Sequence, residues 1–211
     1  FEKRKGIPRF KVEKTDLYVH VDRTVDHIRP YICMAKIENI SLDDNSLRQL
    51  IQLQEKIALS FGRKRSVVGA GLFDADKVTF PLTYKAVKPT EAKFVPLGFN
   101  KEMNLKEILT NHPKGIEFKH LLKNTNKYPI LIDSKGKILT MPPITNSADL
   151  GKVTEETRNL LVEVTGTSFK NCMVALNIFV AALSDRGGKI STITSDYGEK
   201  KVVTPNFEPN L

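Results

Sequence analysis

The chain has 211 residues, of which 40% are hydrophobic and 27% are charged, a composition typical of a globular protein with a buried core. No apolar run approaches the roughly 20 residues of a membrane span, and no signal peptide is visible, which argues against a membrane protein. The formal net charge of +9 is compatible with a polyanionic partner such as nucleic acid, although a lysine-rich proteome explains the charge equally well.

The N-terminal part of the chain combines a basic segment with two predicted strands. Residues 1–14 are basic and weakly patterned, which favours a linker or an arm. Residues 17–22 alternate between apolar and polar side chains and predict the first strand. Arg29-Pro30 then interrupts the chain before a second predicted strand, residues 31–40. Because the chain begins at Phe1 and not at methionine, we expect it to be a fragment of a longer protein.

A predicted helix precedes the most basic cluster in the sequence. Residues 41–44 (Ser-Leu-Asp-Asp) are a helix-start signal, and apolar residues at helical spacing continue to Phe61, before Gly62. The basic cluster that follows is Arg63-Lys64-Arg65. It either compensates the negative end of the helix dipole or contacts phosphate groups, and the sequence favours neither explanation.

The next segment predicts a glycine-containing strand and several short elements. Residues 66–72 form a buried strand whose glycines allow close backbone approach, but these glycines match no nucleotide-binding loop. Short strands are expected near 82–87 and 93–95.

Two short helical segments follow, on either side of a proline. Asn104 caps a helix that ends at His112-Pro113, and a second helical piece runs from Gly115 to Leu122. His112 and His120 would lie on one face of a continuous helix, but Pro113 interrupts it, so we expect no metal site.

A hairpin and the strand after it organise the C-terminal half. Asp133-Ser134-Lys135-Gly136 is a turn sequence between two apolar strands, the first of which starts at Tyr128. The second strand runs into Met141-Pro142-Pro143 and must leave the sheet there, because proline cannot donate a ladder hydrogen bond. A third strand, residues 160–164, carries Glu163 and stops at Thr165-Gly166-Thr167. A carboxylate in an apolar strand is costly unless it has a partner or a function.

The remaining signals complete the prediction of the fold class. Thr154-Glu155-Glu156 reads as a helix start, and a long helix over residues 169–186 is capped by Thr167 or Ser168. A last hairpin is expected from 189–195 and 200–203. Since strands and helices do not alternate regularly, we predict an α+β fold with mixed and mainly antiparallel sheets and several packed helices.

The two cysteines predict a reducing environment. Cys33 and Cys172 lie in apolar runs without metal-ligand spacing, which is typical of buried free thiols. We therefore expect a cytoplasmic protein.

The polar residues near the strand ends suggest a small pocket. No signature of a covalent nucleophile is present. Thr140 lies before Met141-Pro142-Pro143, and Glu163, Thr165 and Thr167 surround Gly166. Such a set can position a water molecule and bind a small ligand. The alternative, which the pattern favours, is a buried polar network that only fixes the fold.

At these residues the chain resembles the beta subunit of archaeal and eukaryotic phenylalanyl-tRNA synthetases, and specifically its central editing module. The resemblance covers roughly Val25 to Ile193. It rests on a set of short strings: Ile28-Arg29-Pro30-Tyr31, Leu53-Gln54-Glu55-Lys56, Arg63-Lys64-Arg65, Phe80-Pro81-Leu82-Thr83-Tyr84-Lys85-Ala86, Tyr128-Pro129, Asp133-Ser134-Lys135-Gly136, Leu139-Thr140-Met141-Pro142-Pro143-Ile144, Thr157-Arg158-Asn159 and Glu163-Val164-Thr165-Gly166-Thr167.

The resemblance implies a hydrolytic function and a set of site residues. The editing module hydrolyses the ester that joins wrongly attached tyrosine to tRNA(Phe). Glu163, Thr165 and Thr140 would then be catalytic. The implied substrate-binding residues are Leu131, Met141, Pro142, Gly166 and Thr167, and the implied tRNA contacts are Arg63, Lys64 and Arg65. Glu163 would either accept the phenolic proton of tyrosine or hold the hydrolytic water.

Three departures from the family pattern concern this site. Family members often carry serine at Thr140, and some carry aspartate at Glu163, so this pocket has an extra methyl group and a longer acid. Relatives often carry a Gly-Thr-His-Asp-like string where this chain has residues 69–74, which lack the histidine. We therefore assign no site role to that loop.

The resemblance also implies domains, partners and an alternative function. We expect an arm and first strand over 1–24, the editing domain over 25–195, and a hairpin strand and linker over 196–211. The implied partners are tRNA(Phe) and the alpha subunit in a heterotetramer. No cofactor is expected for this fragment, since ATP and magnesium serve the full-length enzyme, and we expect no aminoacylation from it alone. The alternative is a non-catalytic tRNA-binding or subunit-docking module.

Overall fold

The computed structural model describes residues 10–207. The first nine residues of the predicted basic arm and the last four of the predicted C-terminal linker lie outside the described residues. The architecture is α+β, with one large mixed sheet and helices packed on it, as predicted.

One sheet of 11 strands forms the framework, in the order β10-β9-β8-β5-β2-β12-β3-β11-β4, with β1 and β13 also paired to β12. Most neighbours are antiparallel, and the parallel pairs are β1–β12, β2–β12 and β2–β5. The strands are β1 (Val12–Glu13), β2 (Tyr18–Val21), β3 (Tyr31–Glu38), β4 (Val68–Asp74), β5 (Leu82–Val87), β8 (Tyr128–Ile132), β9 (Ile138–Met141), β10 (Thr145–Asn146), β11 (Leu160–Gly166), β12 (Lys189–Asp196) and β13 (Lys201–Thr204). A separate ribbon pairs β6 (Lys93–Phe94) with β7 (Met103–Asn104).

β12 joins the two halves of the sheet. Its first half pairs with β3, through Lys189–Thr192, and its second half pairs with β2, through Thr194–Asp196. The strands β2 and β13 precede residue 25 and follow residue 195, so the sheet continues past both expected domain boundaries.

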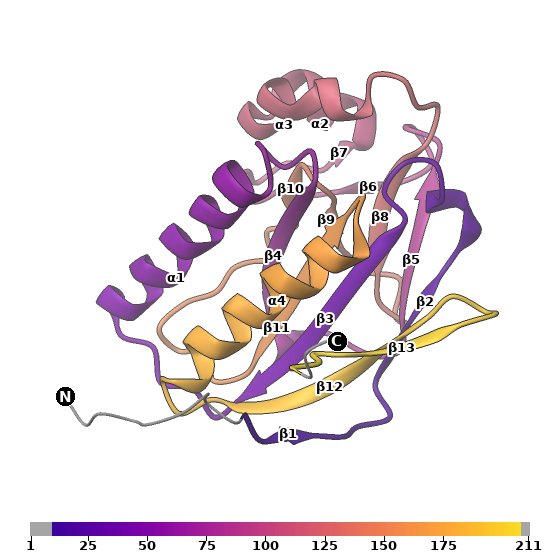
Figure 1. The fold of residues 1–211 in the computed structure, drawn as a ribbon. Coiled ribbons are helices and arrows are strands. Elements are labelled where there is room, and N and C mark those ends of the chain that lie inside the picture. The colour runs from indigo at the N-terminus through magenta and orange to yellow at the C-terminus, as the bar shows by residue number, and fades with distance from the viewer. Residues whose placement is uncertain (1–9, 208–211) are drawn as a thin grey trace.

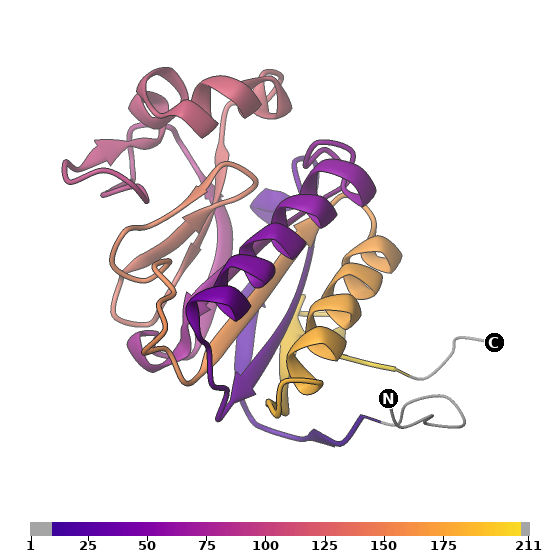
Figure 2. The same ribbon diagram turned by 90° about the vertical axis from the view of Figure 1, so that its left-hand side faces the viewer.

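The helices form two groups on the sheet. The helices α1 (Asp44–Lys56) and α4 (Phe169–Ser184) lie side by side on one face of β3, β11 and β4 (Figures 1 and 2). The shorter α2 (Leu105–Asn111) and α3 (Pro113–Phe118) pack against the β8–β9 hairpin. Within residues 10–207, no helix has the length and apolar character needed to cross a membrane.

Side-chain caps start the helices where the sequence predicts. The Asp43 side chain accepts a hydrogen bond from the Ser46 amide at 2.7 Å, and Asn104 forms a capping box with Glu107. The Ser168 hydroxyl caps α4. The α1 helix continues through a π-helical turn, residues 57–61, and ends at Gly62 as predicted.

The helix predicted to start at Thr154 is wrong. This segment is a turn, in which the Thr154 carbonyl accepts from the Thr157 amide at 3.1 Å. The β11 strand begins at Leu160 and leaves less than about one helical turn of 3.6 residues after Glu156. The Thr154 side chain therefore stabilises a turn, in which its hydroxyl accepts from the Glu156 amide, and no helix follows.

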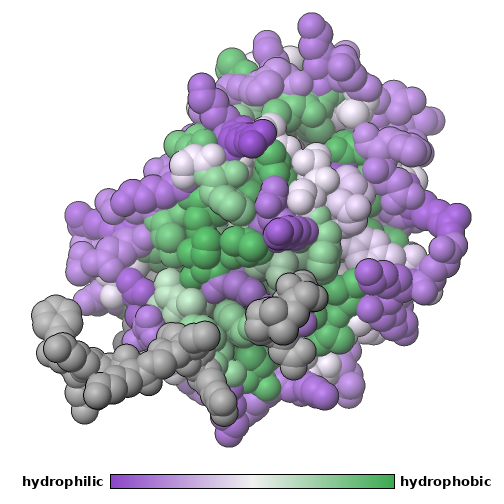
Figure 3. Space-filling model, in the orientation of Figure 1, coloured by the Kyte–Doolittle hydropathy of each residue, from purple (hydrophilic) through white to green (hydrophobic). Residues whose placement is uncertain are grey.

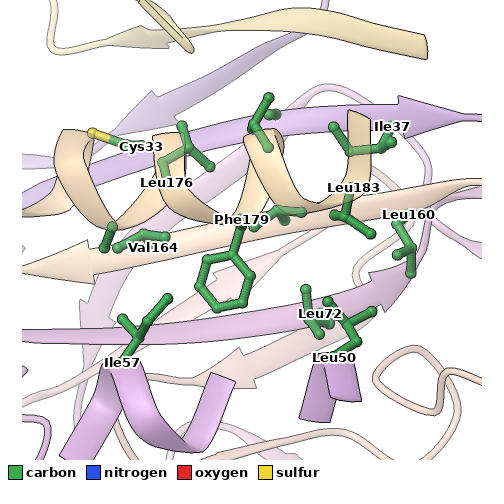
Figure 4. Packing of buried hydrophobic residues seen from close by; sticks show 14 of the residues in the cluster. Cys33, Ile37, Leu50, Ile57, Leu72, Leu160, Val164, Leu176, Phe179 and Leu183 are labelled. Carbon is green, nitrogen blue, oxygen red and sulfur yellow. The ribbon is translucent and has the colours of Figure 1, made fainter. Parts of the chain in front are cut away.

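Alternation along β11 divides the core into two layers. Leu160, Val162 and Val164 contact the cluster under α1 and α4, whereas Leu161 belongs to the cluster on the opposite face of the sheet. Figure 4 shows Phe179 of α4 among Ile57, Leu50 and Leu72 in the first of these clusters. Both cysteines are buried as free thiols, as predicted.

One side of α4 is apolar and exposed. Val174 and Ile178 are 39% and 41% exposed, and Figure 3 shows a hydrophobic area over this part of the molecule. The inner side of α4 is thus buried, and its outer side exposes apolar as well as polar side chains.

Truncation of a buried residue of α4 should destabilise the fold much more than truncation of an exposed one. We expect Leu176→Ala to lower the free energy of unfolding by about 2–5 kcal/mol, because the side chain is fully buried. Val174→Ala, on the exposed side of the same helix, should change it by less than about 0.5 kcal/mol. Urea denaturation of both variants measures the difference, and equal losses would contradict this packing.

Candidate active site

The strand β11 carries two polar side chains away from the helices. Glu163 and Thr165 lie two positions apart and therefore project from the same face, opposite to Val162 and Val164. Both side chains are buried, with 2% and 1% exposure. In the register with the edge strand β4, Glu163 is paired with Gly71 and Thr165 with Gly69. Glycines thus face both polar residues.

The β9–β10 turn supplies the opposite wall. The chain leaves β9 at Met141, turns through Pro142-Pro143 and returns as β10, which pairs with β9. Thr140 lies at the end of β9, and its hydroxyl donates to the Thr145 carbonyl at 3.1 Å. The hairpin turn predicted at 133–136 is present, with Gly136 at a φ of 81°.

These two walls enclose a cavity of about 290 Å³. This is close to the lower end of the usual range for ligand sites, roughly 300 Å³. The lining residues come from α1, the β4 strand, the loops around α2 and α3, the β9–β10 turn and β11. They are Gln54, Arg65, Gly69, Ala70, Leu97, His112, Lys114, Thr140, Pro142, Pro143, Ile144, Thr145, Asn146, Glu163 and Thr165.

A buried arginine fixes Thr165. Arg29 is 3% exposed, and its Nε donates to the Thr165 hydroxyl at 2.9 Å while Nη2 donates to the Thr165 carbonyl at 2.6 Å. Its third hydrogen bond goes from Nη1 to the Arg65 carbonyl at 3.0 Å. Because the Thr165 oxygen already accepts from Arg29, its own hydrogen is free to point toward Glu163.

The basic cluster is divided between the site and the surface. The Arg65 guanidinium donates to the carbonyls of Pro143 and Ile144 at 2.9 and 2.8 Å, and it lies 4.4 Å from the centre of the Phe118 ring. Arg63 and Lys64 are exposed. Arg65 therefore holds the proline turn in place, whereas its two neighbours face solvent.

Glu163 changes its ionisation near neutral pH. Burial raises the pKa of its carboxyl from 4.5 to about 7, because desolvation disfavours the charged form. The Thr165 hydroxyl, the charge of Arg29 and the Gly71 amide lower the pKa and limit the rise. The Oε1 atom is buried and has no hydrogen-bond partner among residues 10–207. One carboxyl oxygen of this cavity-lining residue thus has an unused hydrogen-bonding capacity.

Several predicted site residues do not line the cavity. Leu131 is fully buried among Leu139 and Leu161, and Met141 is buried in the cluster under α2 and α3. Gly166 packs its backbone against Cys172 and the Val67 carbonyl, and Thr167 is exposed. The cavity brings together Thr140, Pro142, Glu163, Thr165 and Arg65 from the predicted set.

Other residues of the cavity were not identified from the sequence. Gly69 and Ala70 line it, although the sequence assigned no role to this loop. His112 also lines it, and its Nδ1 accepts from the Lys114 amide while Nε2 lies 3.0 Å from the Leu97 carbonyl. These two contacts fix the orientation of the His112 ring beside the cavity. Across the described chain, no group of three or more His, Cys, Asp or Glu side chains is placed to hold a metal ion.

The chain matches known proteins along almost its whole length. It is 52% identical over 205 residues to the phenylalanine–tRNA ligase beta subunit of Thermococcus onnurineus, which covers 97% of this chain and 36% of that protein. The beta subunit from Pyrococcus furiosus is 49% identical, again over 97% of this chain and 37% of the relative. The chain thus spans about a third of the length of these relatives. No family model matches.

A solved structure has the same fold. The crystal structure of an N-terminal fragment of the phenylalanyl-tRNA synthetase beta subunit from Pyrococcus horikoshii superposes with a TM-score of 0.94 at 48% identity. The superposition covers 97% of this chain and 59% of that one. Fold and sequence therefore identify the chain as a segment related to aminoacyl-tRNA synthetases. It is homologous to phenylalanine–tRNA ligase beta subunits, which confirms the resemblance seen in the sequence.

Neutralising Glu163 should remove a pH-dependent loss of stability. The folded carboxyl has a pKa of about 7, against 4.5 for an ordinary glutamate, so the folded state holds this proton more tightly. The contribution of Glu163 to the free energy of unfolding is therefore fully present below about pH 4.5. It is lost as the pH rises to about 7, which lowers the free energy of unfolding by on the order of 3 kcal/mol. We expect Glu163→Gln to have a higher melting temperature than the wild type at about pH 8.5, and a similar one at about pH 4.5.

The exposed Glu156 provides the control for this comparison. Glu156→Gln should follow the wild type at both pH values, because its carboxylate is solvated in both states. If the melting temperatures of Glu163→Gln and the wild type differ by the same amount at both pH values, the raised pKa of Glu163 is contradicted.

Proposed function

We propose that this chain is the editing module of a phenylalanine–tRNA ligase beta subunit, and that it hydrolyses tyrosine wrongly attached to tRNA(Phe). The substrate is the aminoacyl ester of the tRNA, and the attacking group is water. The partners of the whole protein would be tRNA(Phe) and an alpha subunit, and ATP and magnesium would serve only the distant synthetic reaction.

The observation that carries the proposal is the unpaired carboxyl oxygen of Glu163, a residue that lines the cavity. Tyrosine differs from phenylalanine by one hydroxyl group, so a site that selects it must offer a polar partner that phenylalanine leaves unpaired. Glu163 lines a cavity of suitable size, and its Oε1 atom is buried and lacks a hydrogen-bond partner among the described residues. An ester is an activated bond, so positioned water and hydrogen bonds can suffice without a covalent nucleophile.

Thr165 and Thr140 would act beside Glu163 in different ways. The Thr165 hydroxyl oxygen accepts from Arg29, and its hydrogen can be donated toward the cavity or toward Glu163. The Thr140 hydroxyl donates to the Thr145 carbonyl, and its oxygen lone pairs remain available as acceptors. Thr140 is therefore suited to accept a hydrogen bond from water or from a ribose hydroxyl.

A second function, tRNA binding without catalysis, is favoured by the charge distribution. The chain has a net charge of +9. Arg63 and Lys64 are exposed, and they directly precede Arg65, which lines the cavity. Basic side chains at such a position can contact phosphate groups. This module would bind tRNA and dock it without hydrolysing the ester.

Removal of the Glu163 carboxyl should abolish editing. We expect Glu163→Ala to lower the rate of Tyr-tRNA(Phe) deacylation by about 100-fold or more, because the variant loses either a general base or the polar partner of the phenolic hydroxyl. Deacylation of purified Tyr-tRNA(Phe) by the 211-residue chain measures this rate, and Glu156→Ala at the surface is the control. Hydrolysis by Glu163→Ala at the wild-type rate would refute the role of Glu163.

The isosteric variant separates the two roles that remain open for Glu163. If the carboxyl recognises the phenolic hydroxyl, Glu163→Gln should weaken deacylation of Tyr-tRNA(Phe) but leave the slow deacylation of Phe-tRNA(Phe) unchanged. If it activates water, both substrates should lose activity by the same factor, and the rise of the wild-type rate through about pH 7 should disappear.

The non-catalytic alternative makes a separate prediction about salt. We expect Arg63→Ala and Lys64→Ala together to weaken tRNA binding, and each lost phosphate contact to reduce the slope of log K against log [salt] by about 1. Filter binding at several salt concentrations measures the slope, and Lys170→Ala on the exposed side of α4 is the control. Strong tRNA binding by a chain that does not deacylate Tyr-tRNA(Phe) would favour this alternative over editing.

A further inference from the structure

Two glycines of β4 lie opposite the polar residues of β11. In the antiparallel register, Gly71 pairs with Glu163 and Gly69 pairs with Thr165. Paired residues project from the same face of the sheet, so any side chain at either glycine would point into the layer that holds the cavity. Neither glycine has a positive φ, so the backbone does not require glycine at these positions.

The space above Gly71 is filled by the carboxyl group of Glu163. A Cβ atom at Gly71 would lie 2.7 Å from Glu163 Oε2 and 2.8 Å from two atoms of the Phe73 ring. A Cβ atom at Gly69 would meet its nearest neighbours, Arg29 Nη2 and Pro143 Cβ, only at 3.3 Å. Contacts below 3 Å force a displacement, so Gly71 is the stricter of the two positions.

The Glu163 side chain therefore runs across the surface of Gly71. Glycine within a strand weakens the strand, by roughly 0.5–1 kcal/mol relative to alanine, because it loses more backbone freedom on folding. At Gly71 the missing side chain leaves room for the carboxyl group of Glu163, whose side chain is longer than that of an aspartate. Aspartate, which is one methylene shorter, would not extend as far over Gly71.

We propose that Gly71 is a specificity-determining position that places the Glu163 carboxyl against the phenolic hydroxyl of the tyrosyl group. The proposal rests on the proposed editing function. Gly71 acts through Glu163 and is thus a positioning residue. Residues 71 and 163 form a matched pair: glycine accommodates glutamate, and a residue with a Cβ atom at 71 accommodates only the shorter aspartate.

A double-mutant cycle in the 211-residue chain tests this pairing. We expect Gly71→Ala to lower kcat/KM for Tyr-tRNA(Phe) deacylation by about tenfold or more, because the carboxyl is displaced. Glu163→Asp should also lower it, because the carboxyl withdraws. The variant that combines both changes should be about tenfold or more better than the product of the two separate effects, since the shorter aspartate makes room for the alanine methyl group and the methyl group fills the space that the carboxyl leaves.

Two controls separate positioning from general damage to the fold. Gly69→Ala combined with Glu163→Asp should show no such coupling, because Gly69 does not face the Glu163 carboxyl. The same cycle in a Phe73→Leu background removes the second close contact of the added methyl group and should retain the coupling. Strictly multiplicative effects of Gly71→Ala and Glu163→Asp in both backgrounds would overturn the proposal.

Melting temperatures keep this inference distinct from the editing function. The same four chains should show a coupled effect on thermal unfolding, with Glu163→Asp recovering part of the melting temperature lost in Gly71→Ala. If the wild-type chain does not deacylate Tyr-tRNA(Phe), the editing function fails and the specificity role of Gly71 fails with it. If the chain deacylates Tyr-tRNA(Phe) but the cycle is additive in both rate and melting temperature, only the role of Gly71 fails.

Discussion

A carboxyl group and a guanidinium group are buried in the same layer of this protein, with Thr165 between them. Burial of charges costs several kcal/mol unless they are fully hydrogen-bonded. Arg29 meets this requirement with three hydrogen bonds, two to Thr165 and one to the Arg65 carbonyl. These acceptors must stay in place, which ties β11 to the loop after α1 and gives the two walls of the cavity one relative arrangement.

The loop after α1 shows what this arrangement demands of the backbone. Arg63, Lys64 and Arg65 all have positive φ angles, of 48°, 51° and 66°. Left-handed conformations cost roughly 1–2 kcal/mol for each residue with a side chain. The hydrogen bonds of Arg65 to the proline turn, and of Arg29 to Arg65, offset that cost and hold the loop beside the cavity. The basic string is thus a structural clamp at Arg65 and a solvated surface at its other two positions.

The sequence predicts the elements well but not the contacts that assemble the site. The strand at residues 82–87 and the caps at Asp43 and Asn104 follow from local patterns, and the structure has each of them at the predicted residues. The helix predicted at Thr154 is absent because a capping sequence does not indicate how many residues remain before the next strand, which here begins at Leu160. Glu163 attracted notice as a carboxylate in an apolar strand. The sequence identified Gly71 only as a strand glycine and Arg29 only as part of a chain break, because their roles depend on the register of β4 against β11 and on a long-range contact, which no local pattern encodes.

The position of β12 has a consequence for how this protein is made. Among the described strands, β12 alone pairs with both groups of the sheet, β3 on one side and β2 on the other, yet of these strands only β13 follows it in sequence. Every residue that lines the cavity, of which Thr165 is the last in sequence, leaves the ribosome before β12. Until β12 is made, no strand pairing within residues 10–207 joins the two groups of the sheet, and long-range pairing of this kind is slow. The strand that joins the two groups of the sheet is therefore made after the residues that form the candidate site.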